Sequence, residues 1–216
     1  MKVGPIAAAL TGIALLAGVA NALPADGFLG NSVGALMRSD LYGFFNFAQT
    51  VNQPCPGGSA GGLRPTGAAF HKLAAIAVAL DGQDRITAIS LSLDRAFVDA
   101  PGQGVFARDV AKSFIRDVAG PAPDPRIGAL ADEIESGLPP KTTLVPLHGA
   151  QPSPQQGPAS PCYRVFLGTG ASCAIAADGE ILTLQDGRPE GDAVVRITFA
   201  PKAGAPAGCL LRKIAD

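Results

Sequence analysis

The pattern in this sequence that most resembles a catalytic motif is a serine among glycines. Residues 57–61 read Gly-Gly-Ser-Ala-Gly and fit the letters GxSxG around Ser59. In hydrolases this pattern places a nucleophilic serine on a sharp turn between a strand and a helix. Here Pro54 and Pro56 precede the serine and Pro65 follows it, so neither a buried strand before it nor a helix after it is expected. We expect Ser59 to lie in an ordinary glycine-rich loop.

The chain has only two histidines, His71 and His148. A catalytic triad would need one of them beside Ser59 together with an orienting carboxylate, and the spacing does not require this. As metal ligands, the two histidines lack a nearby partner of suitable type. Both are expected at a strand edge or on the surface, and we predict no metal site.

Three carboxylates gather in residues 186–192, namely Asp186, Glu190 and Asp192. Such oxygens could hold calcium, but their spacing is not that of the twelve-residue helix–loop–helix site. A solvated connection is the favoured interpretation. The phosphate-binding pattern GxxxxGK[ST] is absent, as is GxGxxG after a strand, so the sequence predicts no nucleotide cofactor or other cofactor.

The four cysteines, Cys55, Cys162, Cys173 and Cys209, match no CxxC, zinc or haem-attachment spacing. An even number in an exported chain predicts disulfides, with three possible connectivities. Cys55 and Cys162 lie in proline-rich loops, whereas Cys173 and Cys209 lie in apolar, strand-like runs. Pairing like with like predicts Cys55–Cys162 and Cys173–Cys209.

Residues 1–22 have the features of a cleavable secretory signal peptide. Lys2 is followed by an uncharged, apolar run up to Val19, and Ala20-Asn21-Ala22 offers small residues where a signal peptidase cuts. The alternative is an uncleaved membrane anchor, since the run is about long enough to span a bilayer. We expect an exported protein, periplasmic or secreted, with no stable membrane insertion after cleavage. The alanine-, glycine- and proline-rich composition suits a bacterial chain.

Composition bounds the function classes. The 216 residues are 47% hydrophobic and 16% charged, which favours a packed globular core. The net charge of −1 gives no overall attraction to nucleic acid or to anionic membranes. With 6% aromatic residues and no tryptophan, a stacking platform for bases or sugars is not expected.

Hydrophobic periodicity predicts helices over 31–51, 105–119 and 124–136, and residues 53–67 are predicted to be irregular. A hairpin is predicted from strands 72–80 and 85–98, with Ile76 opposite Ile89, Val78 opposite Thr87 and Ile86 on a smooth Ala/Ser face. A further strand is expected over 142–147. The C-terminal strands are predicted at 163–167, 171–177, 180–185, 193–200 and 209–214.

These elements predict an α+β fold with antiparallel sheet structure, three helices, a C-terminal β-meander and disulfides. The expected organisation is a signal peptide (1–22), an α+β part (23–148), a linker rich in Pro and Gln (149–161) and the meander (162–216), packed on the first part.

We expect a non-catalytic envelope protein that binds a ligand or another protein. Its partner would be an unidentified envelope protein or a small apolar ligand, held between the hairpin and the helices. The alternatives are a small exported serine hydrolase that uses Ser59 and a histidine, and a structural component of the envelope.

Overall fold

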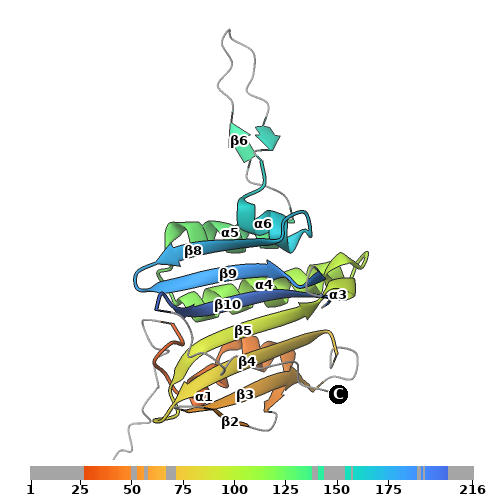
Figure 1. Ribbon diagram of the computed structural model, residues 1–216. Helices are drawn as coiled ribbons and strands as arrows, with labels where there is room; N and C mark the ends of the chain where they lie inside the picture. The colour runs from red at the N-terminus through yellow and green to blue at the C-terminus, as the bar shows by residue number, and fades with distance from the viewer. Residues whose placement is uncertain are drawn as a thin grey trace, which may run out of the picture.

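The computed structural model describes residues 27–49, 53–55, 58–66, 72–137, 141–143, 154–156, 158–188, 191 and 193–203. Within them the fold is α+β: one large antiparallel sheet with helices on one of its faces (Figure 1). The eight strands of this sheet are β1 (Phe47–Gln49), β2 (Gln53–Cys55), β3 (Gly58–Pro65), β4 (Ala74–Asp81), β5 (Ile86–Asp94), β8 (Ser172–Ala177), β9 (Glu180–Asp186) and β10 (Val194–Pro201). The described helices are α1 (Val33–Leu36), α2 (Asp40–Phe45), α3 (Arg95–Asp99), α4 (Gly104–Ala119), α5 (Pro125–Ser136) and α6 (Pro161–Phe166), and a separate ladder joins β6 (Lys141–Thr143) to β7 (Pro154–Gln156).

The strand order of the large sheet is β1-β3-β4-β5-β10-β9-β8, with β2 also pairing with β3. Since β10 lies between β5 and β9, hydrogen bonds join the early and late strands of the chain in a single sheet. β8, β9 and β10 pair antiparallel in chain order. The predicted strand 209–214 lies outside the described residues.

The predicted central hairpin forms, but its register differs from the prediction by two residues. Ile76 pairs with Leu91 and Val78 with Ile89. One residue of the shift comes from the turn, where the Asp81 N–H bonds the Arg85 carbonyl, and the other from a β-bulge between Ala79 and Leu80, which leaves one extra residue on β5. The extra residue is Thr87, whose hydroxyl donates to the Ala79 carbonyl at 3.1 Å. A shift of two keeps most side chains on their predicted face.

The bulge moves Ile86 away from the smooth face on which it was predicted. Ile86 pairs with Leu80 and is fully buried in the main core. The core fills the space between the helices and the bulky face of the sheet, which carries Ile76, Val78, Ile89, Leu91, Leu93, Leu182, Leu184, Val195, Ile197 and Phe199.

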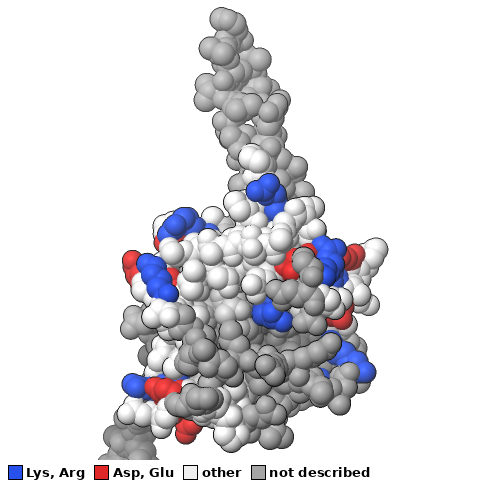
Figure 2. All heavy atoms as spheres, in the orientation of Figure 1, with Lys and Arg blue, Asp and Glu red and all other residues white. Residues whose placement is uncertain are grey.

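The opposite face of the sheet carries mainly small side chains. On the strands β8, β9 and β10 it presents Ala174, Ala176, Thr183 and Thr198, all at least partly exposed. In Figure 2 this part of the molecule faces the viewer, and the charged side chains lie mainly to its sides. One patch of this face is buried, where Cys55 and Ile181 pack against Ala79, Ala88 and Ala200.

Two of the three predicted helices are confirmed. α4 buries the predicted stripe that contains Val110, Phe114 and Val118, and it ends at Gly120. α5 begins after Asp124, whose carboxylate accepts the Arg126 N–H, and ends at Gly137 in the left-handed conformation.

The single helix predicted over 31–51 is wrong, because the chain breaks there into α1, α2 and β1. Ser39 accepts the Tyr42 N–H and so starts a new helix, and Asn46 adopts the left-handed conformation (φ 51°) that ends it. Phe47 then enters β1 and is buried.

The irregular loop predicted over 53–67 is also wrong, since β2 and β3 occupy most of it. Pro54 is accommodated because β2 is a three-residue strand that, among the described strands, pairs only with β3. The glycines allow close approach: a Cβ on Gly58 would lie 1.9 Å from the Leu80 carbonyl oxygen. Gly58, which in the sequence favours a loop, therefore allows close packing between strands.

No helix in the described part of the chain is long and apolar enough to cross a membrane. The predicted signal peptide, residues 1–22, lies outside the described residues.

Candidate ligand-binding groove

A groove with a volume of about 990 Å³ lies where α5, α6 and the free edge of β8 meet. These elements stand side by side at the upper end of the sheet in Figure 1. This position differs from the expected one, between the hairpin and the helices. The groove is lined by Arg126, Ala129, Leu130, Asp132, Glu133 and Ser136 of α5, by Pro158, Ser160, Pro161 and Cys162 at the start of α6, and by Ser172, Cys173, Ala174 and Ile175 of β8.

The β8 wall presents backbone groups rather than reactive side chains. The Asp186 N–H donates to the Ala171 carbonyl, which fixes the phase of the ladder between β8 and β9. In an antiparallel ladder every second residue directs its backbone N–H and C=O toward the same neighbouring strand. The backbone groups of Cys173 and Ile175 therefore bond β9. The N–H and C=O groups of Ser172 and Ala174 therefore point to the open side, into the groove.

Arg126 closes one end of this open edge. Its guanidinium donates to the Ala176 carbonyl at 2.6 Å and is held by two hydrogen bonds to Asp124. Among the described residues this is the one bond that reaches the open side of β8. The pairing lowers the pKa of Asp124 to about 2, since hydrogen bonds from Arg126 favour its charged form. The Arg126–Asp124 pair thus ties the first turn of α5 to β8.

A disulfide holds the groove's other wall to the strand. Cys162, in α6, is bonded to Cys173, in β8, with the two Cα atoms 5.2 Å apart. The predicted pairs Cys55–Cys162 and Cys173–Cys209 are therefore wrong. Cys55 is also disulfide-bonded, and Cys209 lies outside the described residues. The sequence rule failed because α6 packs on β8, which brings a proline-flanked cysteine against a strand cysteine.

The first turn of α6 is anchored to α5. Ser160 accepts the Tyr163 N–H as the N-cap, and Pro161 occupies the first helical position. Both the hydroxyl and the N–H of Ser160 donate to Glu133, a buried carboxylate of α5. The strand predicted over 163–167 is wrong for this reason: Ser160-Pro161 is a helix start that the apolar run after it obscured.

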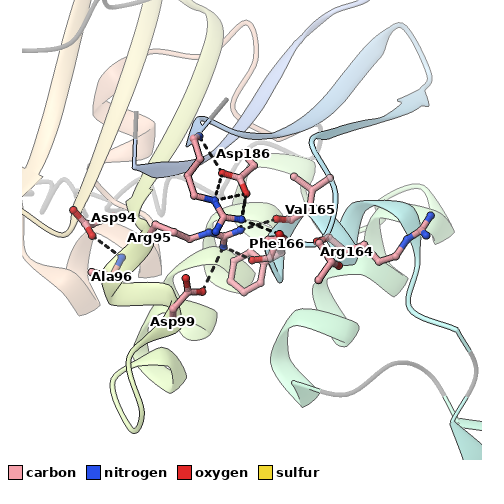
Figure 3. A network of polar contacts seen from close by, with 11 residues as sticks. Asp94, Arg95, Ala96, Asp99, Arg164, Val165, Phe166 and Asp186 are labelled. Carbon is pink, nitrogen blue, oxygen red and sulfur yellow. Dashed lines mark hydrogen bonds and ion pairs between the residues drawn. The ribbon is translucent and has the colours of Figure 1, made fainter. Parts of the chain in front are cut away.

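The last turn of α6 is held by two arginines (Figure 3). Arg95, buried at 4% exposure, donates to the carbonyls of Val165 and Phe166 and to the carboxylate of Asp186. Arg188 bonds the same carboxylate and the Gly168 carbonyl. Positive charge at a helix C-terminus satisfies carbonyls that have no partner within the helix.

Asp186 is the acceptor that links these two arginines. Hydrogen bonds from Arg188, and more weakly from Arg95, hold its pKa at about 2 against the opposing effect of burial. The solvated connection expected for residues 186–192 is thus wrong at Asp186, which is 6% exposed. Glu190 and Asp192 lie outside the described residues. Sequence reasoning missed Arg95 entirely, since a lone arginine after a strand gives no signal of burial.

The candidate catalytic residues do not meet in a described site. Ser59 lies within β3, paired with Pro54 of β2 and Leu80 of β4, and not on a strand-to-helix turn. His71 and His148 lie outside the described residues. Within the described residues, no three His, Cys, Asp or Glu side chains come close enough together to hold a metal ion.

A second cavity of about 530 Å³ lies between the N-terminal segment and the start of α5, and its polar groups serve the fold. Asp117 accepts the Leu41 N–H, and burial raises the pKa of its carboxyl. Asp132 pairs with Arg116. The groove at β8 is therefore the better candidate for a ligand.

Comparison with known proteins gives no further assignment. No known protein family matches the chain, and no characterised protein or solved structure is significantly similar to it.

Proposed function

We propose that this protein is an exported, non-catalytic binding module that holds its ligand in the groove between α5, α6 and β8. The observation that carries the proposal is a groove of about 990 Å³ whose walls are regular secondary structure fixed at both ends. Binding sites for small ligands are concave, largely apolar and largely pre-formed, with volumes of about 300–1,000 Å³.

Fixed walls favour binding because a ligand then need not order them. α6 has only six residues, too short to be stable alone. Its start is held by Glu133 and by the disulfide to Cys173, and its end is held by Arg95 and Arg188. A pre-organised wall reduces the entropic cost of association.

Export forms the second half of the proposal. The Cys162–Cys173 disulfide supports it, because such bonds persist in oxidising compartments such as the bacterial periplasm. The sequence of residues 1–22 adds the features of a signal peptide. There are two alternatives, binding to an envelope protein and a purely structural role in the envelope. The test must distinguish both from ligand binding.

The test is a native mass spectrum of the protein purified from its own envelope fraction. We expect extra mass that disappears on denaturation. Ala129 is exposed on the groove wall, so Ala129→Trp fills the groove without disturbing the core and is expected to remove the extra mass. Ala193→Trp, at an exposed position that does not line the groove, is the matched control and should retain it.

Bound mass that survives Ala129→Trp would place the ligand elsewhere and contradict the proposal. A chain that carries no bound ligand but always co-purifies with one other protein at fixed stoichiometry would instead favour a structural envelope component, provided that Ala129→Trp leaves this association unchanged.

A further inference from the structure

We propose that the ligand of the groove is an extended peptide segment that adds a strand to the open edge of β8. The inference rests on the proposed function, since it names the class of ligand that the groove binds. Strand addition uses main-chain hydrogen bonds for affinity and the pockets beside them for alternate side chains.

The chemistry of the open edge selects a strand over a small apolar molecule. Ser172 and Ala174 each present one N–H and one C=O toward the groove, as the ladder phase with β9 requires. An apolar molecule that filled the groove would bury these groups without partners, which is unfavourable. A peptide backbone beside β8 supplies a donor and an acceptor opposite each of them.

The ends of the groove set the length and direction of the added strand. The open edge runs from Ser172 to Arg126 at the Ala176 carbonyl, a span of four residue steps, or roughly 14 Å at about 3.4 Å per residue. Every strand pair of the large sheet is antiparallel, so we assign the peptide that direction.

Charge complements this direction. In an antiparallel strand the peptide's N-terminal end lies near Ala176 and Arg126, and its C-terminal end lies toward Ser172. On α5, Arg126 lies at the first end, exposed although paired with Asp124, whereas Asp132 lies further along, exposed although paired with Arg116. An acidic residue at the peptide's first position and a basic residue at its last therefore match the groove.

The two faces of an added strand meet different surroundings. Side chains that point inward meet Ala129 and Leu130 of α5 and the disulfide at Cys162, which favours apolar residues. Side chains that point outward continue the small, partly exposed sheet face of Ala174 and Thr183 and favour polar residues. The predicted ligand alternates apolar and polar residues.

The probe is the synthetic peptide Ac-Glu-Val-Thr-Val-Thr-Val-Lys-NH₂, titrated onto the folded, oxidised protein by calorimetry. In the proposed pairing the two threonines lie opposite Ser172 and Ala174, and their amides bond β8, whereas the valine amides point away from β8. N-methylation of both threonine amides is expected to weaken binding about tenfold or more, from the hydrogen bonds lost. N-methylation of two valine amides is the matched control and should change affinity by less than about threefold.

A protein variant tests the same bond from the other side. Ala174→Pro removes a groove-facing N–H that is not part of the β9 ladder, in an edge strand that tolerates proline. We expect roughly tenfold weaker binding, and Ala174→Ser, which keeps the N–H, should bind as the parent does. If Ala174→Pro fails to fold, the N-methyl peptides still decide the question.

The outcomes separate this inference from the proposed function. Equal loss from threonine and valine methylation, or no binding of the peptide while Ala129→Trp still removes a native ligand, overturns the peptide inference alone. No peptide binding together with a native ligand unaffected by Ala129→Trp overturns both.

Discussion

The two edges of the large sheet are treated differently. At one edge, β3 is covered by two short strands, with β1 pairing along Leu63–Pro65 and β2 along Gly58–Ala60. At the other edge, within the residues that the structure describes, β8 pairs only with β9 and Arg126 alone bonds its open side.

Short strands and local cover are the usual means by which proteins stop an edge from pairing with another chain. The β3 edge follows that rule. The β8 edge instead faces a groove, with α6 fixed beside it by Cys162 and Arg95. An open, supported edge is what the proposed strand addition requires, and changes to the supports of β8 should therefore affect binding more than equivalent changes elsewhere.

The largest effect is expected from Arg95→Met. This substitution removes the bonds to the Val165 and Phe166 carbonyls and one ion pair of Asp186, and should lower the free energy of unfolding by about 3 kcal/mol. The control is Arg85→Met, which breaks the exposed pair with Asp81 and should cost less than about 1 kcal/mol. Urea titration measures both, and equal losses would contradict the supporting role of Arg95.

Removal of the groove disulfide comes next. The bond closes a short loop, with a sequence separation of 11, so Cys162→Ser combined with Cys173→Ser should destabilise the protein by about 2–3 kcal/mol. The same double variant should also bind the alternating peptide more weakly, because α6 is then tied less firmly to β8. Thermal unfolding measures the first effect and calorimetry the second. Unchanged peptide binding would show that α6 keeps its position beside β8 without the disulfide.

Acid should also lower the free energy of unfolding, because it protonates Asp186, and by slightly less than removal of the disulfide does. The folded-state pKa of Asp186, about 2, lies below that of an unfolded aspartate, so its charge stabilises the fold fully above about pH 4. That stabilisation, on the order of 2 kcal/mol, is lost as the pH falls from about 4 toward 2. Asp186→Asn should remove this part of the pH dependence of urea unfolding, and an identical pH profile in the variant would refute it.

Much of the fold follows from sequence patterns. α4 and α5 were predictable because their apolar periodicity ends in clear signals, Asp124 before α5 and Gly120 and Gly137 after the two helices. The central hairpin was predictable from alternation. Its register was displaced by one residue at the turn, where Arg85 lies opposite Asp81, and by one more at the Thr87 bulge, which no residue type indicates.

The site was less predictable because it depends on contacts between elements distant in the chain. The Cys162–Cys173 pair follows from α6 packing on β8, and local proline content cannot reveal that. Arg95 reaches residues about 70 to 91 positions away. The open edge itself consists of backbone groups, so the residue types at Ser172 and Ala174 do not reveal it in the sequence.

Amide hydrogen exchange along β8 tests the central claim most directly. In the free protein we expect the Ser172 and Ala174 amides to exchange fast, while the Cys173 and Ile175 amides are protected by β9. Addition of the alternating peptide should slow exchange at Ser172 and Ala174 and leave the other two amides unchanged. Protection of all four amides before any ligand is added, or no change at Ser172 and Ala174 when the peptide saturates the protein, would contradict the account.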